Sequence, residues 1–171
     1  IAFAIAMITY YLTLEPTVSF WDCGEYISTA FKLEVGHPPG APLFQIFGRF
    51  FSLFATDTSQ VAFMINLMSA FFSALTILFL FWTITALSKK IILKSAELTQ
   101  SNVIAILGSG LVGSLAYTFS DSFWFSAVEG EVYGMSSFFT AITFWCILKW
   151  ESEAEDKYSS RWIVLISFII G

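Results

Sequence analysis

Charged residues, cysteine and histidine are scarce in this sequence, and each shortage excludes a class of protein. Only 12% of the 171 residues are charged, and eight lysines and arginines stand against thirteen aspartates and glutamates. Because no basic stripe is present, nucleic acid is not an expected partner. Two cysteines are too few for a disulfide framework, and a single histidine is too few for a metal site by itself.

Apolar and aromatic residues dominate instead, at 57% and 19% of the chain. Both values fit an integral membrane protein whose partner is the lipid bilayer. Spanning segments must satisfy their own backbone hydrogen bonds, so the sequence predicts an all-α, polytopic membrane protein. The chain begins without methionine inside one apolar run and stops inside another. We therefore interpret residues 1–171 as the N-terminal fragment of one transmembrane domain.

Long apolar runs predict where the chain crosses the membrane. The expected spans lie at about residues 1–14, 61–87, 102–120, 123–150 and 162–171, with an outer loop at 15–60 and a loop at 88–101. Asn66, Ser69 and Ser73 recur at helical spacing in the second span, which favours packing between helices. In the third span, Gly108, Gly110 and Gly113 are expected to allow close backbone approach.

Positive residues predict the orientation. They gather in or beside two loops, at Lys89, Lys90 and Lys94 and at Lys149, Lys157 and Arg161. The positive-inside rule assigns both loops to the cytoplasm. The 15–60 loop then faces the periplasm from a bacterial inner membrane, or the lumen from an endoplasmic-reticulum membrane.

Polar residues concentrate in this outer loop, where Asp22 and Glu25 stand three residues apart. On one helix face they suit a base or a cation partner. Alternatively, Ser19 and Asp22 form a capping box. Downstream, the run from Pro42 to Phe54 has polar positions at helical spacing and is too short to span, so it predicts an amphipathic interfacial helix.

Two further carboxylates, Glu129 and Glu131, interrupt the fourth span near its start. Within a helix, side chains two residues apart point in nearly opposite directions, so the two cannot both line one cavity. Because an ionisable group in lipid is costly, one of them is expected to be functional or paired.

Three cationic side chains, Lys32, His37 and Arg49, lie in the outer loop. His37 heads a rigid bend with Pro38, Pro39 and Gly40. Arg49 suits a phosphate, or it snorkels from an interfacial helix. Asp22, Glu25 and His37 could together hold a divalent cation, which leaves a cofactor open, although we assign no metal site.

Several of these residues form motifs. The runs are Phe20-Trp21-Asp22-Cys23-Gly24-Glu25, His37-Pro38-Pro39-Gly40-Ala41-Pro42-Leu43, Gly48-Arg49, Phe123-Trp124 and Glu131-Val132-Tyr133. In this order they resemble the transmembrane-protein-260-like family, which includes a protein O-mannosyltransferase and falls in the GT-C glycosyltransferase superfamily. The resemblance covers essentially the whole chain.

The resemblance implies a GT-C-like fold whose first outer loop carries interfacial helices. It implies an enzyme that moves a sugar, mannose above all, from a polyprenyl-phosphate donor to serine or threonine hydroxyls of exported proteins, with inversion. The catalytic residues would be Asp22 and Glu25. The substrate-binding residues would be Trp21, Lys32, His37, Arg49, Glu131 and Tyr133. A non-catalytic scaffold subunit of an envelope complex and a transporter subunit are the competing interpretations.

Overall fold

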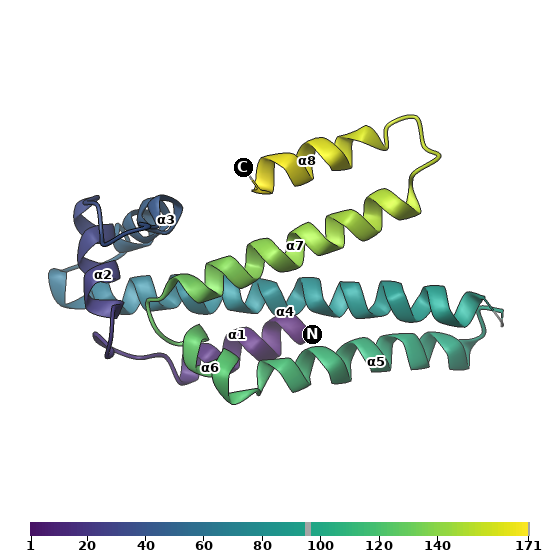
Figure 1. Ribbon diagram of the computed structural model, residues 1–171. Helices are drawn as coiled ribbons and strands as arrows, with labels where there is room; N and C mark the ends of the chain where they lie inside the picture. The colour runs from purple at the N-terminus through teal and green to yellow at the C-terminus, as the bar shows by residue number, and fades with distance from the viewer. Residues whose placement is uncertain (95–96, 171) are drawn as a thin grey trace.

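The computed structural model describes residues 1–94 and 97–170, and these ranges form helices without strands (Figure 1). The elements are α1 (Ala2–Leu12), α2 (Cys23–Lys32), α3 (Pro42–Ser52), the 3-10 turn η1 (Thr58–Gln60), α4 (Val61–Leu93), α5 (Gln100–Thr118), α6 (Asp121–Ala127), α7 (Val132–Ser152) and α8 (Ser160–Ile170). The all-α prediction is confirmed for the described residues.

Helix α4 is the central element, and α1, α5 and α7 pack along it (Figure 1). Among the described residues, three segments are long and apolar enough to cross a membrane: Thr58–Leu93, α5 and α7. By contrast, α1 and α8 have 11 residues each, whereas a crossing needs about 20. Residues 95, 96 and 171, which belong to the predicted loop and last span, lie outside the described residues.

Two predicted boundaries need correction. Helix α4 continues beyond Leu87 to Leu93, so the expected loop at 88–101 begins too early. The expected span at 123–150 is divided into α6 and α7 by residues 128–131. The Glu131 amide donates to the Glu129 carbonyl at 2.8 Å, which closes a tight turn in place of a helical hydrogen bond.

Gly130 shows why the chain breaks there. A Cβ atom on this residue would lie 2.9 Å from Asn66 Oδ1 and 3.1 Å from an Ile27 side-chain carbon. The turn therefore packs directly against α4 and α2, closer than a residue with a side chain permits. This contact turns both neighbouring glutamates toward the outer loop.

The two ends of the bundle carry different elements. Helices α2, α3 and α6 lie at one end, and the C-terminal ends of α4 and α7 lie at the other (Figure 1). Lys90, near the C-terminal end of α4, and Glu151, near the C-terminal end of α7, form an ion pair there. The lysine-bearing loops thus share one end, as the positive-inside interpretation requires, and the 15–60 segment is at the opposite end.

The polar residues of α4 pack as the sequence indicates. Asn66 is fully buried and its Nδ2 donates to the carbonyls of Glu15 at 2.7 Å and Thr17 at 2.8 Å. Ser69 Oγ donates to the Glu131 carbonyl at 3.4 Å. This seam holds the start of the outer loop and the 128–131 turn against α4.

Helix α3 is amphipathic with its polar face turned inward. Gln45, Gly48 and Ser52 are buried. Its outer face carries large apolar side chains, 45–63% exposed, at Leu43, Ile46, Phe50 and Leu53. A helix whose apolar face lacks cover within the described chain suits the surface of a bilayer.

Candidate active site

Three hydrogen bonds tether residues 15–23, which end at the first residue of α2, to the turn before α7. The Glu15 amide donates to the Val128 carbonyl at 3.0 Å, and the Ser19 hydroxyl donates to the Glu129 carboxylate. The Cys23 thiol donates to Glu131 Oε1 at 3.4 Å. Glu129 and Glu131 are both buried against this segment. The expectation that they point in opposite directions is wrong, because residues 128–131 are not helical.

Asp22 occupies the N-cap position of α2 and is exposed. Within the described chain, its side chain makes no capping hydrogen bond. Ser19 is not the cap either, since its hydroxyl is bonded to Glu129, so the capping-box interpretation is wrong. The Asp22 carboxylate is left facing outward at the site where the resemblance predicts a base.

Trp21, directly before Asp22, is in the left-handed region at φ 61°, and its side chain is 89% exposed. Bulky residues rarely adopt this conformation. The tethers at Ser19 and Cys23 on either side hold the backbone in it. The indole thereby projects from the same short loop as the predicted base.

Glu25 and His37 form a paired unit. The His37 amide donates to Glu25 Oε1 at 2.6 Å, and His37 Nδ1 bonds to Glu25 Oε2 at 3.0 Å. These hydrogen bonds lower the pKa of Glu25 and raise the pKa of His37. Asp22 and Glu131 also lie near enough to raise the His37 pKa further. The structure therefore brings Asp22, Glu25, His37 and Glu131 into one neighbourhood.

The buried part of this neighbourhood favours uncharged groups. Burial is the main cause that raises the pKa of Glu131, and it raises the pKa of the Cys23 thiol to about 12. The protonated forms of Glu131 and Cys23 are thus favoured beneath the loop. Asp22 and the Glu25–His37 pair lie nearer the surface of the loop.

The other predicted residues take different positions. Arg49 Nη1 donates to the Phe31 carbonyl at 2.9 Å, and its guanidinium lies 5.1 Å from the centre of the Phe31 ring. It therefore fastens α3 to the end of α2. Lys32 is exposed in the last turn of α2, and Tyr133 is 60% exposed in the first turn of α7.

The same residues do not assemble into a metal centre. Across residues 1–94 and 97–170, no three His, Cys, Asp or Glu side chains are grouped to hold an ion. Glu25 and His37 meet, but Asp22 does not join them as a third ligand. A divalent cation stays an untested prediction.

Sequence reasoning missed Ser19 and Cys23 as partners of the buried glutamates. They lie 110 and 108 residues before Glu129 and Glu131. Local spacing carries no signal for contacts of this range, so only the fold could reveal them.

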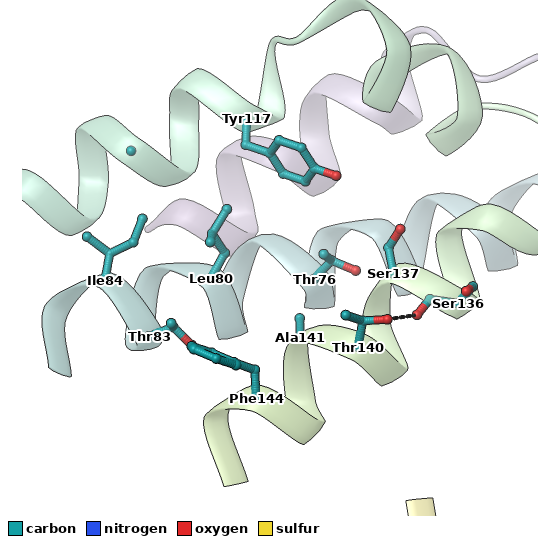
Figure 2. A pocket seen from close by; sticks show the side chains of 11 residues that line it. Thr76, Leu80, Thr83, Ile84, Tyr117, Ser136, Ser137, Thr140, Ala141 and Phe144 are labelled. Atoms are coloured by element: carbon teal, nitrogen blue, oxygen red, sulfur yellow. Dashed lines mark hydrogen bonds between the residues drawn. The ribbon is translucent and has the colours of Figure 1, made fainter. Parts of the chain in front are cut away.

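A hollow of about 480 Å³ lies between α4, α5 and α7 (Figure 2). Its lining combines apolar side chains with hydroxyls, among them Thr76, Thr83, Ser136 and Thr140. Ser136 also lines a smaller apolar hollow, of about 210 Å³, beside Ala41 and Pro42. The two hollows share the lining residue Ser136 on α7.

Comparison with known proteins gives these features a context. A family model described as the protein O-mannosyl-transferase TMEM260 N-terminal domain matches residues 22–171, beginning at Asp22. This chain belongs to that family. The matched range contains each predicted site residue except Trp21, which precedes it by one position.

Two relatives agree with the family model. Protein O-mannosyl-transferase tmem260 of Dictyostelium discoideum is 32% identical over 141 residues, or 82% of this chain and 15% of the relative. Protein O-mannosyl-transferase TMEM260 of Mus musculus is 28% identical over 169 residues, or 99% of this chain and 22% of the relative. The chain thus spans less than a quarter of the length of either relative. No solved structure matches it.

Proposed function

We propose that this chain is the N-terminal part of a GT-C type membrane glycosyltransferase. It moves a sugar, mannose above all, from a polyprenyl-phosphate donor to serine or threonine hydroxyls of exported proteins. The names of both relatives support mannosyl transfer to protein. The observation that carries the proposal is the Asp22 carboxylate, which is exposed, freed from capping and held beside the Glu25–His37 pair.

Asp22 acts as the general base. The acceptor oxygen attacks the anomeric carbon from the face opposite the phosphate, Asp22 takes the hydroxyl proton, and the bond to phosphate breaks with its electron pair leaving on the phosphate oxygen. One displacement inverts the anomeric configuration. Trp21, Glu131 and Tyr133 contribute to sugar or acceptor binding, because they lie before Asp22 or at the start of α7.

The leaving phosphate needs positive charge or hydrogen-bond donors. Lys32, His37 and Arg49 supply these in the outer loop. The hollow beside Pro42 and the hollow between α4, α5 and α7 support binding of an apolar polyprenyl tail, since apolar side chains line both.

In this proposal α4, α5 and α7 cross the membrane and α3 lies on its surface. The 15–60 segment faces the periplasm in a bacterial inner membrane, or the lumen in an endoplasmic-reticulum membrane. Lysine-bearing connections at the opposite end support this orientation.

The test uses the full-length protein in nanodiscs with polyprenyl-phosphate mannose and a Ser/Thr-rich exported acceptor. Intact mass should show added hexose, and NMR of the glycopeptide should show inversion of the donor's anomeric configuration. A protein that transfers none of a panel of lipid-linked sugars would overturn the proposal in favour of a scaffold. Retention of configuration would overturn the single displacement only.

A further inference from the structure

We infer that His37 is the residue that donates a hydrogen bond, from Nε2, to the phosphate of the donor, and that Glu25 is a positioning residue for His37. This inference rests on the proposed function. It moves Glu25 from the catalytic residues to the support of a substrate-contacting histidine.

The geometry of the pair carries the inference. Both Glu25 oxygens are engaged by the same residue, one by the His37 amide at 2.6 Å and one by Nδ1 at 3.0 Å. A Cβ atom on Gly36 would lie only 3.1 Å from Glu25 Oε1, so this side of the carboxylate is closed by backbone. Glu25 thus has little freedom to bind a substrate as well.

The same contacts orient the imidazole. With Nδ1 held by the carboxylate, Nε2 occupies the other edge of the ring, and the His37 side chain is 43% exposed. The Tyr26 ring lies 5.8 Å from the His37 ring, centre to centre, and limits its rotation. A carboxylate on one nitrogen fixes what the other nitrogen presents, here an N–H donor.

The other cations of the loop are less suited to this role. Arg49 already donates to the Phe31 carbonyl and covers the Phe31 ring. Lys32 is an exposed side chain with a flexible stem, so its charge is not fixed in place. Among the three, His37 is the one whose ring nitrogen is bonded to a carboxylate, which leaves its other nitrogen as an oriented donor.

The surrounding charges favour the protonated form of the His37 ring. Glu25 and Asp22, from the start of α2, and Glu131, from the turn before α7, are the groups that raise the His37 pKa, with Glu25 first. In the reaction Asp22 receives the acceptor proton, while the imidazolium stabilises the charge left on the phosphate and keeps its own proton.

The first experiment measures transfer by the full-length protein against pH for wild type, Glu25→Gln, His37→Gln and the double variant. Glu34→Gln is the control, an exposed acid in the same loop. We expect the transfer rate to fall as pH rises through the His37 pKa. This falling limb of the pH–rate profile should move to lower pH in Glu25→Gln, because Glu25 raises the His37 pKa. His37→Gln should lose about 10²- to 10³-fold in kcat, and the double variant should lose no more than His37→Gln alone. Additive losses with an unmoved limb would overturn the positioning role.

The second experiment separates this inference from the proposed function. Histidine-labelled protein in nanodiscs is titrated with polyprenyl phosphate that carries no sugar, and the His37 signal is assigned by its loss in His37→Gln. The Nε2 resonance should shift on binding, and the His37 pKa should be lower in Glu25→Gln. If sugar transfer fails but Nε2 still responds, the proposed function is wrong and phosphate recognition stands. If transfer succeeds while Nε2 does not respond, the role of His37 is overturned.

Discussion

Glu153 at one end of the bundle has the opposite kind of partner from Glu129 and Glu131 at the other end. At the end that carries the lysines, Glu153 accepts from Lys149 at 2.8 Å and Arg161 at 2.7 Å. These bonds and one from Trp162 lower its pKa to about 2. At the other end Glu129 and Glu131 accept from a hydroxyl and a thiol, and the pKa of Glu131 is raised.

This difference distinguishes a carboxylate that stabilises the fold from carboxylates that are expected at a functional site. The lowered pKa of Glu153 is accounted for by its hydrogen bonds with Lys149, Trp162 and Arg161. A buried carboxylate beside neutral donors is costly, and perturbed acids of this kind cluster at functional sites. We therefore expect substitutions near α2 to change transfer, and substitutions at the lysine end to change stability alone.

The largest expected effect is on Asp22→Asn, which should reduce the transfer rate by about 10²- to 10⁴-fold, because the amide cannot accept the acceptor proton. Initial rates with lipid-linked mannose measure it. Asp121→Asn, an exposed acid in the first turn of α6, is the matched control and should keep full activity. Equal activity of wild type and Asp22→Asn would move the base to another carboxylate.

The stability of the fold should also be sensitive to an added methyl group beneath the site. A Cβ on Gly134 would lie 2.7 Å from Ser73 Oγ and 3.0 Å from the Ser69 carbonyl, so Gly134→Ala should destabilise the fold by about 1–3 kcal/mol. Gly108→Ala, where a Cβ meets nothing within 4 Å, should raise stability by about 0.5–1 kcal/mol. Denaturant unfolding in detergent measures both. If the two variants behave alike, close packing is not what distinguishes the site end.

The tether between Ser19 and Glu129 should be coupled to transfer. A double-mutant cycle with Ser19→Ala and Glu129→Gln should give a coupling of about 1 kcal/mol in stability, because the hydroxyl and the carboxylate are bonded directly. Each single variant should lower kcat while leaving the pH profile unchanged, since neither touches the reacting atoms. A coupling near zero would remove this tether from the support of Asp22.

The sequence predicted the features that depend on neighbouring residues. Apolar runs located α4, α5 and α7, and helical spacing in α4 predicted the packing seam at Asn66 and Ser69. The polar stripe from Gln45 to Ser52 predicted an amphipathic helix. Each of these signals lies within a few turns of one helix, where periodicity is informative.

Contacts between distant segments could not be predicted from periodicity within one helix. The turn at 128–131 is bonded to partners about 110 residues away, and the capping-box prediction failed because the Ser19 hydroxyl is bonded to Glu129 and α2 begins after Asp22. The glycine spacing in α5 also failed to show which glycines allow close packing. Gly108 faces open space, whereas Gly110 and Gly113 meet side chains of α4. Which groups meet at the site is a property of the fold rather than of any local pattern.

The smallest expected effect is on Glu153→Gln at the lysine end. The pKa of Glu153 is lowered from an ordinary 4.5 to about 2, so its contribution to stability is present above pH 4.5 and is lost as pH falls toward 2. The variant should therefore melt slightly below wild type at neutral pH and converge with it in acid, because exposed ion pairs contribute little. Its transfer rate should equal that of wild type. A loss of transfer comparable to that of Asp22→Asn would mean that the two ends are coupled, and that paired acids also serve the reaction.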